Sequence, residues 1–148
     1  MIRVSIASPQ ELVAPPFALL REAARVVLQS EGVKEAKISL AFVDNTTIHG
    51  INKRFLNHDE PTDVITFPMS GAGAKTMEGE LVVGVEIALE QAKDRGHPVE
   101  VELCLYVIHG LLHLCGYDDV KSRDAAEMRM KEREYLKALG LPDISEKQ

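Results

Sequence analysis

The sequence has few cysteines and no long apolar run, and each shortage excludes a class of protein. Two cysteines in 148 residues are too few for a disulfide-rich miniprotein. A hydrophobic share of 45% with 27% charged residues is ordinary for a globular chain and excludes wholesale disorder. No apolar run approaches the ~20 residues that cross a bilayer, so no membrane partner is expected. The start, MIRVSIASPQ, lacks the apolar stretch of a secretory signal, which predicts a cytoplasmic location.

Basic residues are also in short supply. The chain has 17 Lys and Arg against 23 Asp and Glu, a net charge of −6 and a pI near 5.4. Taken alone, this balance argues against a nucleic-acid partner. The acidity is segregated, however, because residues 59–102 hold ten acidic and three basic residues, whereas residues 49–58 hold Lys53, Arg54 and two histidines without an acid. Net charge therefore does not exclude RNA.

Hydrophobic periodicity predicts an α/β chain with alternating strands and helices. The predicted strands are Ile2–Ile6, Lys37–Val43, Val64–Phe67 and Glu80–Val85. The predicted helices are Phe17–Ser30, Asp44 or Asn45 to Phe55, Glu86–Arg95, Val99–Leu114 and Ser122–Leu139. We expect one layered domain over residues 1–148, with a small mixed sheet of about four strands packed by about five helices around a central buried helix, Val99–Leu114.

Cys104 and Cys115 both fall in or at the end of this buried helix. Their separation of eleven residues corresponds to ~16 Å of helix. A disulfide needs Cα atoms within ~7 Å of each other, so the two residues are predicted to be buried thiols.

The chemically informative segment is HGLLHLCGYDD, His109 to Asp119. His109 and His113 are four residues apart, which places both imidazoles on one face of the helix. Gly116 ends the helix, so the chain can return Asp118 or Asp119 to that face. Two imidazoles and a carboxylate with an open fourth position are typical of a catalytic zinc site. The alternative is a pair of core histidines that are hydrogen-bonded to the protein. An imidazole without hydrogen-bond partners would be energetically expensive in an almost wholly apolar helix.

One residue argues against a peptidase of the HExxH type. In those enzymes the Glu after the first His is the general base. Gly110 stands at that position here.

Three blocks of the sequence resemble the YbeY-type endoribonuclease family. The family's run His-Gly-x-Leu-His-Leu-x-Gly-Tyr-Asp-His appears as HGLLHLCGYDD. Its second block appears as Asn52 followed by DEPTDVITF, Asp59 to Phe67. Its third block, a strand that leads into a helix with Gln-Ala, appears as Gly79–Leu81 and Gln91–Ala92. The blocks occur in the family's order, and together they are highly specific.

The resemblance implies that His109, His113 and Asp119 bind one zinc ion. The family has a third His where this chain has Asp119. A carboxylate oxygen is also a zinc ligand, and a set of two histidines and one carboxylate suits iron or manganese as well. The resemblance also implies a catalytic part for His109.

Two further catalytic residues are predicted, Glu80 and Arg54. Glu80 stands at the position of a family Asp and would orient a ligand or accept a proton. The alternative for Glu80 is a surface carboxylate of a strand. Many members have an Arg after the aromatic residue of the second block, where this chain has Leu56. Arg54, Lys53 or His58 would then supply the positive charge, and a solvated surface charge is the alternative for each.

By resemblance, the expected function is metal-dependent cleavage of single-stranded RNA in the maturation of ribosomal RNA at the 16S 3′ end and in ribosome quality control. The expected partners are ribosomal RNA and the ribosome or its small subunit, with no DNA. Two alternatives stay open. One is a metal-dependent hydrolase of another substrate. The other is a non-catalytic ribosome-associated protein with a structural metal, for which Cys115 is a poor fourth ligand because it lies roughly 200° around the helix from His113.

Overall fold

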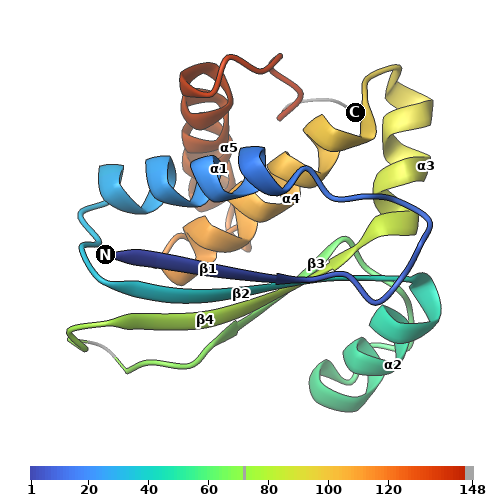
Figure 1. Cartoon of the computed structure of the whole chain (residues 1–148), viewed down its shortest axis with the longest axis horizontal. Helices are drawn as coiled ribbons and strands as arrows, with labels where there is room; N and C mark the ends of the chain where they lie inside the picture. The colour runs from blue at the N-terminus through green and yellow to red at the C-terminus, as the bar shows by residue number, and fades with distance from the viewer. Residues whose placement is uncertain (72, 146–148) are drawn as a thin grey trace.

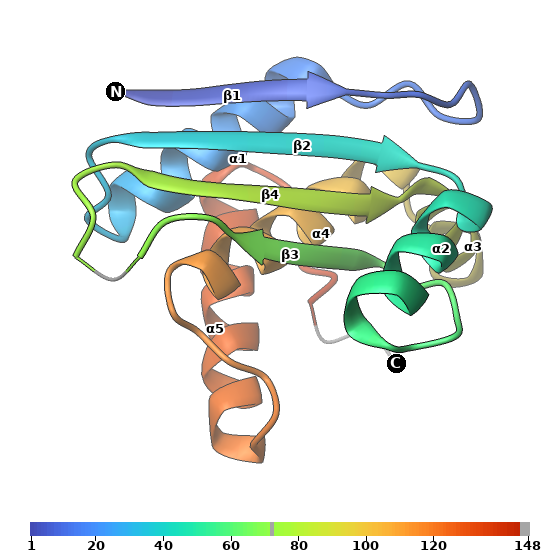
Figure 2. The ribbon, with the colours of Figure 1, turned by 90° about the horizontal axis from the view of Figure 1, so that it is seen from below.

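A four-stranded mixed sheet carries five helices (Figures 1 and 2). The computed structural model describes residues 1–71 and 73–145. The strands in that part are β1 (Ile2–Ala7), β2 (Ala36–Val43), β3 (Val64–Pro68) and β4 (Met77–Gly84). The helices are α1 (Phe17–Ser30), α2 (Asn45–Leu56), α3 (Val85–Arg95), α4 (Val99–Leu114) and α5 (Ser122–Ala138). This confirms the predicted α/β class.

The strand order is β1-β2-β4-β3. β1 is parallel to β2, and β2 is parallel to β4, with Ala36 opposite Met77 and Val43 opposite Gly84. β3 is antiparallel to β4, with Val64 opposite Val83. Within residues 1–71 and 73–145, β3 pairs only with β4 and is therefore an edge strand. The sheet is mixed, as expected.

Helix α4 is the buried centre of the molecule. Figure 1 shows α1, α4 and α5 on one side of the sheet and α2 on the other. α4 contacts α1, α3 and α5 as well as β3 and β4. Because helices surround it, its buried residues run almost continuously from Val101 to Leu112. This explains why the helix is apolar on nearly all sides and confirms the prediction of a central buried helix.

The ends of two helices near the site follow local rules. The side chain of Asp44 caps α2 by accepting a hydrogen bond from the backbone N–H of Thr47 at 2.9 Å. α2 ends at Asn57, whose φ is +58°. α4 ends at Cys115, and Gly116 follows with a φ of +103°, a conformation that glycine adopts without strain. The chain can therefore turn sharply directly after His113.

The start of β4 differs most from the prediction, and the other strand bounds agree within one residue. β4 begins at Met77, three residues before the predicted start at Glu80, because Met77–Gly79 pair with Ala36–Ile38 of β2. Gly79 lowers the strand propensity of this segment. Packing favours glycine at this position, however, because an added Cβ would lie 2.7 Å from Cδ2 of Leu114 on α4. Residues 72 and 146–148 of the predicted domain lie outside the described residues.

Cys104 and Cys115 are both free thiols, as predicted, but only Cys104 is buried, whereas Cys115 at the end of α4 is half-buried. Among the described residues, the chain has no helix with the length and hydropathy of a membrane span.

Candidate metal centre

His109, His113 and Asp119 bring three ligand atoms together at the end of α4. Nε2 of His109 lies 3.2 Å from Nε2 of His113. Oδ2 of Asp119 lies 3.2 Å from Nε2 of His109 and 3.7 Å from Nε2 of His113. The two imidazole rings are nearly perpendicular, at 82° with centroids 4.7 Å apart. We call these three residues the triad.

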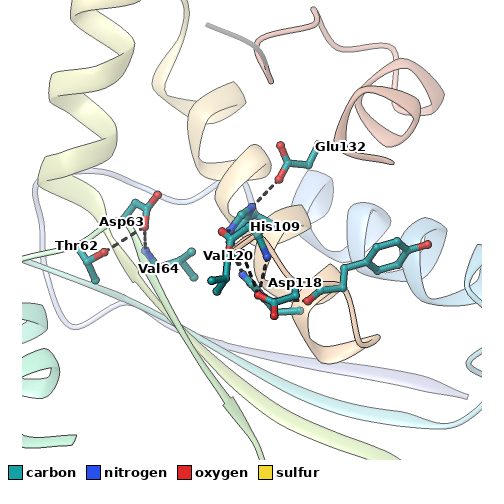
Figure 3. Close-up of polar contacts among 10 residues, drawn as sticks. Thr62, Asp63, Val64, His109, Asp118, Val120 and Glu132 are labelled. Carbon is teal, nitrogen blue, oxygen red and sulfur yellow. Dashed lines mark hydrogen bonds and ion pairs between the residues drawn. The ribbon is translucent and has the colours of Figure 1, made fainter. Parts of the chain in front are cut away.

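The other nitrogen of each imidazole has a partner of its own. Nδ1 of His109 lies 2.5 Å from Oε2 of Glu132 on α5, as Figure 3 shows. Nδ1 of His113 lies 3.1 Å from the backbone carbonyl oxygen of Tyr117. Both partners are acceptors, so each Nδ1 carries the proton and each Nε2 presents its lone pair to the triad. Histidine ligands of metals are held in this way.

The spacing of the ligand atoms fits a divalent cation. Zinc bonds of roughly 2.0–2.1 Å at tetrahedral angles separate ligand atoms by about 3.3–3.4 Å. The observed separations of 3.2, 3.2 and 3.7 Å lie near that value. Two nitrogen lone pairs and a carboxylate that face one another repel unless a positive charge lies between them. The three residues could therefore hold a metal ion as a two-histidine, one-carboxylate set.

The structure separates the roles of the two adjacent aspartates. The carboxylate of Asp118 accepts hydrogen bonds from the backbone N–H groups of Asp119 and Val120, at 2.7 and 3.2 Å. It thereby folds the loop that brings Asp119 back over α4. Of the two aspartates, it is Asp119 whose carboxylate oxygen groups with the two imidazoles within 4.8 Å.

The electrostatics of His109 reflect its carboxylate neighbours. Burial by itself would lower the pKa of His109. The hydrogen bond to Glu132 and the negative charges of Glu132, Asp63 and Asp119 outweigh burial and raise the pKa. The site is thus electronegative and attracts cations.

Two open cavities meet at the triad. The first, of about 540 Å³, extends between α3, α4 and α5 and is lined in part by Arg95, Arg129 and Glu132. The second, of about 450 Å³, is lined by Leu56 and by β3 residues. Asp63, His109 and Asp119 line both cavities. A cation bound by the triad would therefore be accessible to a substrate from two sides.

The segment DEPTDVITF brings Asp63 and β3 to this site. Oδ1 of Asp63 accepts hydrogen bonds from the backbone N–H of Val64 at 2.7 Å and from the hydroxyl of Thr62 at 3.3 Å (Figure 3). The carboxylate of Asp63 thus closes a turn with Thr62 and Val64, and the same residue lines both cavities.

Leu56 and Arg54 lie at the C-terminal end of α2 but differ in placement. Leu56, at the family's Arg position, lines the second cavity together with the triad. Arg54 lies over the ring of Phe55, with its Cζ atom 5.4 Å from the ring centroid. Arg54 is not among the described residues that line either cavity. A direct catalytic role for Arg54 stays a prediction without geometric support.

The structure does not bring Glu80 to the triad. On β4 the neighbouring residues Gly79 and Leu81 face α4, since Leu114 abuts Gly79 and Leu81 abuts Gly110. Side chains alternate between the faces of a strand, so Glu80 projects from the opposite face. Its predicted catalytic role therefore has no support from the geometry, and the alternative of a strand carboxylate agrees with it.

Glu132 is the residue of the site that sequence reasoning missed. It is buried, with 5% of its surface exposed, although it is charged. Its neighbours on the buried face of α5 are Met128, Tyr135 and Leu136, so Glu132 interrupts an apolar stripe. A carboxylate on the apolar face of an amphipathic helix was the available signal.

A half-buried carboxylate, that of Glu31, fastens the loop that carries Asp119. Glu31 accepts a hydrogen bond from the hydroxyl of Tyr117 at 3.0 Å and another from the hydroxyl of Tyr135 on α5. Lys131 lies 3.7 Å from the same carboxylate. These contacts join the end of α1, the loop after α4 and α5.

The fold and the site define a small α/β protein in which two histidines and a carboxylate that could hold a cation lie at the junction of two cavities. Comparison with known proteins agrees with this class. A family profile described as Endoribonuclease YbeY matches residues 13–140. The chain is 39% identical to Endoribonuclease YbeY of Pelotomaculum thermopropionicum over 130 residues, 83% of this chain and 86% of that protein. It is 38% identical to the Bacillus cereus protein of the same name over 136 residues, 84% of this chain and 87% of that protein.

The fold also has a solved counterpart. The solution structure of TM1509 from Thermotoga maritima aligns with a TM-score of 0.66 and 29% identity, over 94% of this chain and 89% of that one. The chain belongs to the Endoribonuclease YbeY family.

Proposed function

We propose that this chain is a metal-dependent endoribonuclease that cleaves single-stranded RNA during ribosomal RNA maturation, with a part in ribosome quality control. The observation that supports it most directly is the convergence of two Nε2 atoms and a carboxylate oxygen at 3.2–3.7 Å beside two open cavities. Family membership supports RNA as the substrate. The proposed setting is the cytoplasm, with the small ribosomal subunit as partner, the 16S 3′ end as target and no role for DNA or membranes.

Zinc is the first candidate for the metal, and iron or manganese suits the same ligands. A bound divalent cation would polarise a phosphoryl oxygen or lower the pKa of a bound water to about 7. The chain itself would fix the geometry. Glu132 and the Tyr117 carbonyl hold the imidazole planes, and Asp118 holds the loop of Asp119.

The alternative of a purely structural metal is less well supported. A structural zinc site is usually closed by four protein ligands. Only three such residues group together among those that the structure describes. Cys115 lines a different cavity, together with Glu31 and Tyr117.

The experiment that tests the proposal is cleavage of a structured RNA with single-stranded tails. The metal-loaded chain should cut the tails, whereas the chelated chain and His113→Ala should not. Glu127→Gln, an exposed change on α5, is the matched control and should cut normally. Equal cleavage by native chain and His113→Ala would refute the proposal, because the activity would then come from a contaminant.

The same reaction distinguishes two nucleophiles. A product with a 2′,3′-cyclic phosphate indicates attack by the RNA 2′-hydroxyl, and a linear phosphate without the cyclic form indicates attack by water. A DNA strand of the same sequence should remain intact.

A further inference from the structure

A pair of aromatic rings, one exposed and one partly buried, lies beside the metal centre, on the other side of edge strand β3. Phe55 of α2 and Phe67 of β3 meet edge to face, with ring centroids 5.8 Å apart and an interplanar angle of 82°. Phe55 is 60% exposed. We call Phe55 and Phe67 the aromatic pair. Figure 2 shows α2 beside β3.

The packing of α2 against the sheet explains the position of Phe67 but not that of Phe55. A small apolar cluster holds α2 against the sheet through Val43, Ile48, Ile65 and Val82, and Phe67 packs against its margin. Phe55 continues outward from this cluster into solvent. A single exposed apolar side chain is ordinary, but Leu56 next to it is 45% exposed and Met69, two residues beyond Phe67, is 66% exposed. Apolar side chains are therefore exposed both at the end of α2 and just beyond β3.

This surface is contiguous with the triad. Leu56 directly follows Phe55 and lines the 450 Å³ cavity together with the three triad residues. Thr66 and Pro68, on either side of Phe67, line the same cavity. Because side chains alternate along β3, Phe67 lies on one face of the strand and the triad cavity on the other. A flexible chain that leaves the triad around this edge meets the aromatic pair.

The charge beside the rings suits a phosphate backbone. In the surrounding segment, His49 and Lys53 lie 2.6 and 3.9 Å from Asp59. His58 lies 3.8 Å from Glu60. Arg54, by contrast, has no carboxylate partner among residues 1–71 and 73–145, and its guanidinium lies over the Phe55 ring. A guanidinium over an aromatic ring keeps its N–H donors for an anion.

We propose that the aromatic pair stacks one unpaired base of the RNA whose scissile phosphate lies at the triad, while Arg54 contacts the adjoining backbone phosphate. The inference deepens the proposed function and depends on it. Proteins that bind single strands combine aromatic faces for bases with cations for phosphates. A base within a duplex is stacked on both sides and cannot reach the pair. The aromatic pair thus explains a preference for single strands.

The test measures binding of a fluorescein-labelled, 2′-O-methyl single-stranded RNA to the metal-loaded protein, together with KM and kcat on the cleavable RNA. Phe55→Ala should weaken binding and raise KM by about 5- to 100-fold, with the loss in KM rather than kcat. Phe55→Tyr should restore binding because it keeps a ring, whereas Phe55→Leu should not. Phe17→Ala is the matched control, since Phe17 is also exposed, at 45%, but lies on α1.

An abasic scan locates the base. Removal of a single base near the cleavage position should weaken binding to the native chain as much as Phe55→Ala does. The same removal should have no further effect on Phe55→Ala, because the two changes delete one contact. If the loss of binding from base removal adds to the loss from Phe55→Ala at every position, the proposal is overturned.

Other outcomes are equally decisive. Full rescue by Phe55→Leu would mean that apolar area rather than stacking matters, and would overturn the proposal. So would an unchanged KM in Phe55→Ala accompanied by loss of self-association, which would mark the surface as a protein interface. Native protein that neither binds nor cuts RNA refutes the proposed function itself. Native protein that cuts, with Phe55→Ala indistinguishable from it, refutes only the stacking site.

Discussion

Oε2 of Glu132 on α5 lies 2.5 Å from Nδ1 of His109 on α4, across 23 residues of sequence. The side chain of Glu132 is almost completely buried, with 6% of its surface exposed. A buried carboxylate next to an imidazole holds the ring in one orientation and makes the distal nitrogen a stronger donor to a metal. The contact thus couples the packing of α5 to the geometry of the triad.

Glu132→Gln should weaken zinc binding by roughly 10- to 100-fold, because the neutral amide no longer strengthens His109 as a ligand. Competition with a chromophoric chelator measures the dissociation constant. Glu127→Gln on the exposed side of the same helix should leave it unchanged. Equal zinc affinity in Glu132→Gln and native protein would show that the contact is structural only.

Asp119→His should change metal preference rather than abolish binding. A third imidazole replaces a hard carboxylate oxygen with a softer nitrogen, which favours zinc over manganese. The ratio of zinc to manganese affinity is therefore expected to rise, by about tenfold or more as an order of magnitude. Elemental analysis after dialysis against both metals provides the measurement. Loss of both metals in a folded variant would argue that the loop cannot present a larger ligand.

Leu56→Arg should increase RNA cleavage, because it brings a guanidinium into the cavity that the triad lines. A hydrogen bond to a charged group contributes about 1.5–3 kcal/mol, which corresponds to roughly 10- to 100-fold in kcat/KM. Leu56→Gln, similar in length but uncharged, is the control and should give a smaller gain. A decrease with Leu56→Arg would show that the apolar wall itself contributes to substrate binding.

Both cysteines should resist alkylation near neutral pH. Burial raises the pKa of Cys104 to about 12. Burial, with a smaller contribution from the charge of Glu31, raises the pKa of Cys115 to about 11. The reactive form is the thiolate, which at pH 8 makes up only about one Cys115 in a thousand at any moment, so labelling is slow and its rate should rise about tenfold per pH unit.

Mass spectrometry after iodoacetamide treatment measures this rate. The denatured chain is the control, since an ordinary thiol pKa near 8.5 makes both residues react quickly at pH 8. Rapid labelling of Cys115 in the folded protein at pH 8 would contradict the expected pKa.

Gly110→Ala should destabilise the protein, although alanine favours helices. A Cβ at Gly110 would lie 2.8 and 2.9 Å from the two Cδ atoms of Leu81, which is fully buried. Overpacking of this kind lowers the free energy of unfolding by about 1–3 kcal/mol. Gly50→Ala in α2 is the matched control, because nothing lies within 4 Å of its added Cβ. It should stabilise by about 0.4–1 kcal/mol. Urea unfolding of both variants measures the change in the free energy of unfolding. An increase in this free energy for Gly110→Ala would refute the close-packing explanation.

Local patterns in the sequence were sufficient for most elements and for part of the site. The apolar run around His109 and His113 specifies a helix, and the four-residue spacing fixes that their side chains share a face. Asp44 and Gly116 mark helix ends by their own chemistry. These features depend on neighbours within a turn or two, which the sequence shows directly. The resemblance to the family added Asp119 as the third predicted metal ligand.

The other parts of the site were decided by tertiary structure alone. Glu132 reaches His109 only because α5 packs against α4. Glu80 faces away from the triad because close packing at Gly79 and Gly110 turns the other side of β4 toward α4. Alternation along a strand shows that two faces exist, but it does not show which face meets which helix. That choice, like the meeting of Phe55 with Phe67, is made by contacts between segments that are distant in sequence, and local propensity carries no information about them.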